Sequence, residues 1–139
     1  MRTTYFRILC CSVALASLSG CDLPFWPEPP PVLSKEAVAT RDAPPERVFR
    51  GTLAGKAAFL IVNDCEVFDV QRGAGEEVTW TSVLKPEFYP FFTFCERQSM
   101  TVEADAIVVT LGRMAFGAGG CCATGGTYRT TDGRTWKKI

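Results

Sequence analysis

The stretch VFRGTLAGKAAFLIVNDCEVFDV, residues 48–70, decides the fold class of this chain. It divides into three short segments rich in β-branched and aromatic residues: 48–53, 57–62 and 66–70. Asn63-Asp64 is a tight-turn signal between the second and the third segment. These residues therefore predict three successive β-strands.

The chain downstream continues the same pattern. Residues 78–84 alternate apolar and polar side chains as a half-buried strand does. Residues 88–94 hold five aromatic side chains and are expected to form the heart of the core, with Pro90 marking an edge or a bulge. Further strands are expected at 101–103, 106–111, 113–117, 126–130 and 135–138.

No stretch shows a sustained apolar repeat of helical period. The sequence thus predicts an all-β domain over residues 46–139, with about eight to ten short antiparallel strands in a meander, sandwich, small barrel or two-blade-like arrangement. Seven of the nine prolines lie between Asp22 and Pro45, so residues 21–45 are expected to be an extended tether. A short helical turn is predicted within it at 34–40.

The N-terminus has the features of a secretion leader. Arg2 and Arg7 precede an apolar stretch at 8–18, which is about half the length that a membrane-spanning helix needs. The run Leu18-Ser19-Gly20-Cys21 resembles the lipobox of bacterial lipoproteins. That resemblance implies that residues 1–20 are removed and that Cys21 carries acyl chains such as palmitate, which hold the protein on a membrane.

The resemblance also implies a location in the bacterial cell envelope, facing the periplasm. Asp22 resembles the inner-membrane retention signal of enterobacterial lipoproteins and favours that membrane, with the outer membrane as the alternative. The chain has 15 basic and 15 acidic side chains, and the loss of Arg2 and Arg7 would leave a net charge of −2. This balance argues against nucleic acid as a partner.

Four cysteines remain after the leader: Cys65, Cys95, Cys121 and Cys122. Disulfides persist outside the cytoplasm, and a domain of this size needs such crosslinks. One arrangement joins Cys65 to Cys95 and Cys121 to Cys122; the others join the adjacent pair to Cys65 and Cys95. Adjacent strand residues point to opposite faces, and the second kind of arrangement is favoured. A zinc site is not expected, because C-x₂-C spacing and histidine are both missing.

The C-terminal run YRTTDGRTW, residues 128–136, resembles an Asp-box in its shorter form that lacks one glycine, the β-hairpin signature of sialidase and sortilin-type propeller blades. Asp132-Gly133 favours a turn with positive φ, and the Asp132 carboxylate can accept its backbone N–H groups. The resemblance implies a folding role, without catalysis, for five residues: Thr131, Asp132, Gly133, Thr135 and Trp136.

No enzyme is predicted. The chain has no histidine and no nucleotide-binding or nucleophile motif, and no cofactor is expected beyond the lipid on Cys21. The layout of lipobox, short β domain, paired cysteines and DGRTW hairpin resembles the immunity lipoproteins that neutralise type VI secretion lipase effectors. That resemblance implies capture of a protein toxin, with Arg113, Tyr128, Arg129 and Arg134 as expected anchors. The alternative is a structural or accessory lipoprotein of an envelope complex.

Overall fold

The computed structural model describes residues 29–117 and 121–139. The chain divides into two units at Pro31, and every helix and strand described lies in the second unit, Val32–Ile139. The predicted leader, the predicted acylation site Cys21 and the predicted sorting residue Asp22 lie outside the described residues.

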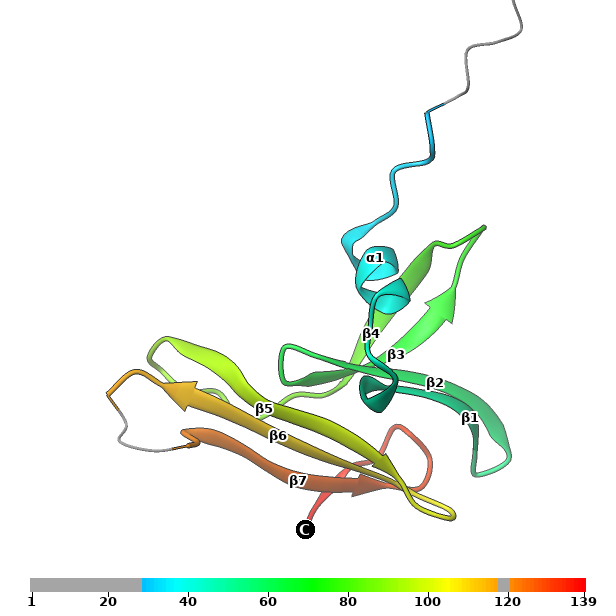
Figure 1. Cartoon of the computed structure of the whole chain (residues 1–139). Coiled ribbons are helices and arrows are strands. Elements are labelled where there is room, and N and C mark those ends of the chain that lie inside the picture. The colour runs from blue at the N-terminus through cyan, green and yellow to red at the C-terminus, as the bar shows by residue number, and fades with distance from the viewer. Residues whose placement is uncertain (1–28, 118–120) are drawn as a thin grey trace, which may run out of the picture. The chain divides into compact units, whose positions relative to one another are not determined.

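The first sheet is a four-stranded antiparallel meander with the order β1-β2-β3-β4 (Figure 1). Its strands are β1 Val48–Leu53, β2 Lys56–Asn63, β3 Glu66–Arg72 and β4 Val78–Leu84. Two-residue turns join the first three strands, Ala54-Gly55 and Asp64-Cys65, and all four residues have positive φ. Two central residues with positive φ match the right-handed twist of the flanking strands, so each pair of strands closes into a tight hairpin.

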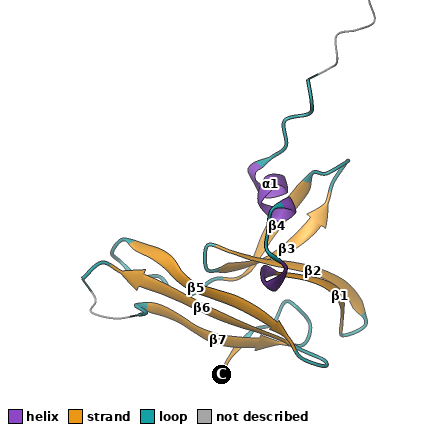
Figure 2. Ribbon diagram, viewed as in Figure 1, coloured by secondary structure: helices purple, strands orange, loops and turns teal. Residues whose placement is uncertain are grey.

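The second sheet repeats this connectivity with the order β5-β6-β7-β8. Its strands are β5 Thr93–Val102, β6 Ile107–Ala115, β7 Thr124–Thr130 and the two-residue β8 Lys137–Lys138. Figure 2 shows β5, β6 and β7 side by side as the long strands of this sheet. The prediction of a small antiparallel β domain with a disulfide is confirmed, and the described residues form eight strands.

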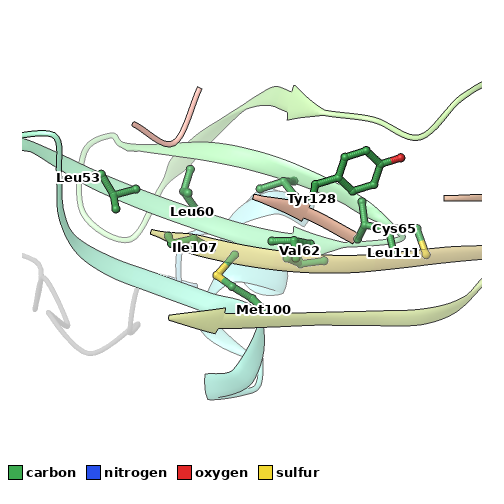
Figure 3. Close-up of a cluster of buried hydrophobic side chains, with 10 residues drawn as sticks. Leu53, Leu60, Val62, Cys65, Met100, Ile107, Leu111 and Tyr128 are labelled. Atoms are coloured by element: carbon green, nitrogen blue, oxygen red, sulfur yellow. The ribbon is translucent and has the colours of Figure 1, made fainter. Parts of the chain in front are cut away.

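The core lies between the two sheets and is mostly aliphatic (Figure 3). Alternate residues along each strand point inward, because successive strand side chains project to opposite faces. The buried cluster is Leu53, Leu60, Val62, Cys65, Val67, Met100, Ile107, Val109, Leu111 and Tyr128. Each large aliphatic side chain in it stabilises the fold by about 1.5–3 kcal/mol through removal from water.

The prediction that residues 88–94 form the heart of the core is wrong. The segment is the link between β4 and the start of β5, and Phe88, Phe91 and Phe92 are 90%, 72% and 73% exposed. Pro86 and Pro90 have no N–H to donate to a ladder, so this stretch cannot extend either sheet. The hydrophobic content of a segment therefore did not predict its burial.

The predicted helical turn is present as α1 Lys35–Arg41, which is followed by the 3₁₀ turn Pro45–Arg47. Ser34 caps α1 by accepting a hydrogen bond from the amide of Ala37. The indole Nε1 of Trp80 on β4 donates to Thr40 Oγ1 at 2.9 Å, and the amide of Ser34 donates to Glu77. These contacts place α1 within the β domain, so the predicted domain boundary at residue 46 is wrong and the compact unit starts at Val32.

Candidate functional site: the outer face of the second sheet

The second sheet has an outer face, opposite the core, formed by the residues that alternate with the buried ones. Met100, Val109, Leu111 and Tyr128 point into the core. Their neighbours along β5, β6 and β7 therefore point outward. Five such residues carry the argument that follows: Arg97, Ser99, Thr110, Gly112 and Thr127.

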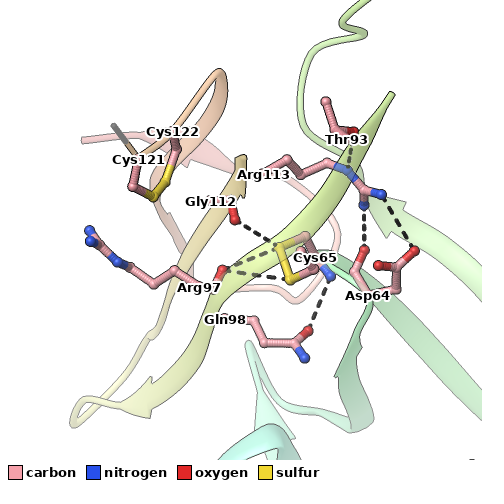
Figure 4. Close-up of a disulfide and its surroundings, with 10 residues drawn as sticks. Asp64, Cys65, Thr93, Arg97, Gln98, Gly112, Arg113, Cys121 and Cys122 are labelled. Atoms are coloured by element: carbon pink, nitrogen blue, oxygen red, sulfur yellow. Dashed lines mark hydrogen bonds and ion pairs between the residues drawn. A yellow bond between two sulfur atoms is a disulfide. The ribbon is translucent and has the colours of Figure 1, made fainter. Parts of the chain in front are cut away.

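The disulfides are not arranged as we favoured from the sequence. Cys65, in the turn after β2, is bonded to Cys95 on β5, and Cys121 is bonded to Cys122 (Figure 4). Cys65 is fully buried among the core residues, and its Sγ lies 3.4 Å from the carbonyl oxygen of Gly112. A Cβ added to Gly112 would point outward and meet Sγ of Cys122. The two pairs therefore lie on opposite faces of β6, and the favoured cross-pairing is wrong because the sheet separates them.

A hollow of about 360 Å³ opens beside the adjacent cysteines. All four strands of the second sheet contribute to its lining, including Arg97 of β5, Thr110 of β6, Thr124 of β7 and Lys138 of β8. The hydroxyls of Thr110 and Thr127 are 3.3 Å apart, and Lys138 Nζ lies 3.6 Å from Glu87 Oε1. The hollow is thus polar and carries more positive than negative charge.

Two groups in this hollow lack partners. Thr124 Oγ1 is buried and has no hydrogen-bond partner among the described residues. Arg97 is exposed, and within residues 29–117 and 121–139 its guanidinium forms no ion pair. An arginine without a counter-ion offers a planar set of donors that suits a carboxylate or a phosphate.

The structure does not bring together the four residues that we expected to bind a partner. Tyr128 is only 7% exposed and belongs to the core. Arg113 donates from Nη1 to the carbonyl oxygen of Asp64 at 2.7 Å and from Nε to Thr93, so it links the two sheets. These two residues have structural roles within the domain, and their role as partner anchors stays a prediction.

Arg129 and Arg134 have different surroundings. Arg129 forms ion pairs with Glu103 at 3.2 Å and Asp105 at 3.3 Å, so its charge is already matched within the chain. Arg134 is exposed in the turn before β8 and does not line the hollow. Sequence reasoning missed Arg97, which no local motif marks; its position follows only from the alternation of β5 against a known core.

The C-terminal turn has the hydrogen bonds that the sequence predicted. Asp132 Oδ1 accepts from the amides of Arg134 at 2.8 Å and Thr135 at 2.7 Å, and Gly133 has φ +74°. The backbone hydrogen bonds from Thr135 and Arg134 hold the pKa of the Asp132 carboxyl well below its usual range. The ring of Trp136 packs against the core cluster. These residues have a folding role in this chain, and they position β8 beside β7.

A second surface feature is an aromatic patch, which we define as Phe88, Phe91, Phe92 and Phe116. Phe116 follows β6 and is 76% exposed. Its ring stacks on Phe92 at 5.7 Å between centroids and contacts Phe94 at 5.5 Å. Phe94 is next to the inward-facing Cys95 and so points to the outer face, which places the patch at one end of that face.

The described residues contain no group of three or more histidine, cysteine or acidic side chains that could hold a metal ion. In that same part of the chain no helix combines the length and the apolar character needed to cross a bilayer. No protein family model, curated protein or solved structure matches this chain.

Proposed function

We propose that this chain is a membrane-anchored, periplasm-facing lipoprotein that binds a protein, and that it acts as an immunity protein against a secreted antibacterial toxin of the type VI lipase class. The support for the anchor is the lipobox-like run at 18–21. The single observation that supports the binding function is that the guanidinium of Arg97, beside the polar hollow on the outer face, forms no ion pair with the described residues.

The hollow suits the capture of a protruding acidic side chain. A carboxylate that enters it can accept two parallel hydrogen bonds from the guanidinium of Arg97, which lines the hollow. Such charge-assisted bonds are worth about 1.5–3 kcal/mol each. The ladders of the second sheet hold the backbone of the lining residues in place, so little backbone conformational entropy is lost when a partner binds.

Capture by such a face needs no chemistry from this chain. A stable protein interface covers about 800 Å² of each partner, which is far more than the hollow itself provides. The surrounding outer face, with Ser99, Thr110 and Thr127, supplies a polar rim around it. A toxin held in this way is inhibited by steric exclusion from its target.

The test is purification of the full chain from detergent extracts of cells that encode it, followed by mass spectrometry and by quantitative binding to the partner recovered. Arg97→Ala is expected to weaken binding by about tenfold or more, because an acidic group of the partner loses its counter-ion. Arg134→Ala is the matched control, since Arg134 is exposed but does not line the hollow.

Two results would contradict the proposal. Binding that depends on Arg134 and not on Arg97 would move the interface to the turn before β8. Recovery of resident envelope machinery alone, together with no rescue of cells that express the toxin in the periplasm, would support the accessory-lipoprotein alternative. Mass analysis of the mature N-terminal peptide tests the acylation of Cys21 separately from both.

A further inference from the structure

The aromatic patch leaves four large apolar rings in water. Phe88, Phe91, Phe92 and Phe116 are 72–90% exposed. Other exposed apolar side chains, such as Val102 and Ile139, lie at the end of β5 and at the C-terminus. Single exposed apolar residues are ordinary, whereas three exposed phenylalanines in one five-residue segment, with Phe116 stacked on one of them, mark a surface that is covered when the protein works.

The patch rings protrude, and two of them, Phe92 and Phe116, contact each other. Phe92 and Phe116 stack at 5.7 Å, and Tyr89 meets Phe91 edge to face at 5.9 Å. The lining of the hollow beside the adjacent cysteines contains no patch phenylalanine. Protruding rings suit a fluid apolar phase, because a fluid phase adapts to them without a complementary shape.

The charges near the patch are neutralised within the chain. Lys85 lies 3.5 Å from Glu66, and Glu87 lies 3.6 Å from Lys138. The segment that carries three of the four rings therefore has no excess of positive charge that would seek anionic groups. Apolar burial is the force that remains for covering this surface.

The length of chain before the domain identifies what can cover the patch. Ten residues lie between Cys21 and Val32, where the compact unit begins, so eleven Cα–Cα steps join the two. A fully extended chain of that length spans at most about 40 Å. A bilayer that holds acylated Cys21 is thus always within reach of the domain. A short tether gives an effective concentration in the millimolar range, so even a feeble affinity of the patch for lipid is enough to seat it.

We infer that the aromatic patch inserts into the surface of the bilayer that holds the anchor, so that the domain has a second contact with lipid. This inference rests on the acylation of Cys21 in the proposed function. It also places the proposed binding site relative to the membrane, because the patch and the hollow share the outer face of the second sheet. The capture face would then stand beside the membrane, where a lipid-degrading toxin acts.

The test uses the full acylated chain in phosphatidylcholine vesicles with brominated acyl chains, which quench tryptophan at a known depth. Phe91→Trp places the probe in the patch, and Val102→Trp is the matched control at an exposed site on the far end of β5. With the signal of the parent chain subtracted, the tryptophan at 91 is expected to be quenched several-fold more than that at 102. Equal, slight quenching at both sites would overturn the inference.

A second measurement does not depend on the anchor. The Cys21→Ser chain, made without lipid, is expected to co-sediment with phosphatidylcholine vesicles at millimolar lipid, to the same extent when anionic phosphatidylglycerol is added. Serine at Phe88, Phe91 and Phe92 should abolish this binding, whereas serine at Val102 and Ile139 should leave it unchanged.

The arms of this experiment separate the competing explanations. No vesicle binding by the Cys21→Ser chain, together with protection of the patch only when a protein partner is added, would assign the patch to that partner and overturn the inference. Vesicle binding by a chain whose natural form carries no acyl group would leave the patch as a lipid contact while refuting the proposed anchor. Partner binding through Arg97 is measured without vesicles, so its result does not depend on the lipid inference.

Discussion

Gly133 shows how one residue joins a local turn to the core. Its φ of +74° belongs to the left-handed region, which a residue with a Cβ enters only at a cost. A Cβ there would also lie 3.3 Å from Cδ1 of Leu53 and 3.5 Å from Cδ1 of Leu60, both in the core. The turn before β8 thus packs directly on the first sheet.

Gly133→Ala should therefore destabilise the domain by more than backbone strain alone. The strain is about 1–2 kcal/mol, and crowding of the two leucines is expected to add about 1 kcal/mol or more. The matched control is Gly55→Ala, which has φ +76° and no atom within 4 Å of the added Cβ. Urea unfolding measures both variants, and equal losses would show that the contact with Leu53 and Leu60 is unimportant.

Asp132 makes the stability of the same turn depend on pH. Backbone hydrogen bonds to its carboxylate lower its pKa in the folded chain, while the unfolded value stays near about 3.9. The stabilisation is then present above the unfolded pKa and is lost as the pH falls below it. Asp132→Asn should lower the free energy of unfolding at pH 7 and reduce the difference between pH 7 and pH 3. Urea unfolding at the two pH values measures these free energies. An equal loss of unfolding free energy from pH 7 to pH 3 in the wild type and in Asp132→Asn would contradict the prediction.

At the scale of the element, the positions of the strands were predicted well, whereas the burial or exposure of the side chains was predicted less well. Residues 48–53 and 78–84 are β1 and β4 as the sequence predicted, because alternation and turn residues are local properties. The expected strands at 106–111 and 113–117 are instead one strand, β6, in which Gly112 pairs with Arg97 and makes room for Cys122. Gly112 does not interrupt the strand; its missing side chain lets Sγ of Cys122 lie close to the backbone of β6.

The aromatic link between β4 and β5 was the largest error at this scale. Its composition indicated a core segment, yet the core is filled by aliphatic residues from both sheets. The link crosses between sheets and contains Pro86 and Pro90, so its backbone joins neither ladder until Thr93. Hydrophobicity alone does not distinguish a core strand from a surface that another phase or partner covers.

At the scale of the whole molecule, two independent meanders become one compact unit through a shared core and one crosslink. The Cys65–Cys95 disulfide joins the turn between β2 and β3 to β5 and closes a loop with a sequence separation of 30. Arg113 reinforces this junction by binding Asp64 across the sheets. The crosslink restrains the unfolded chain far more than the bond between two adjacent cysteines can.

Replacement of both Cys65 and Cys95 by alanine should cost about 3–4 kcal/mol of unfolding free energy, from the entropy of closing that loop. Cys121→Ser with Cys122→Ser is the matched control and should cost less, because the sequence separation of that pair is 1. Urea unfolding measures the loss of stability in both variants. Peptide mapping of the wild-type chain without reductant should recover a Cys65–Cys95 crosslink and no free thiol. A crosslink between either partner and Cys121 or Cys122 would refute the arrangement.

The sequence by itself determined the all-β class, most strand positions, the capped helix and the hydrogen-bonded turn at Asp132, since each depends on neighbours within a few residues. The tertiary structure decided which cysteines pair and that Tyr128 is buried while Phe91 is exposed. It also decided that, among the described residues, Arg113 has a partner in Asp64 and Arg97 has no ion pair. The physical reason is that a strand shows which residues share a face, but only the packing of the second sheet selects the face that meets the core. The candidate binding surface is what that selection leaves on the outside.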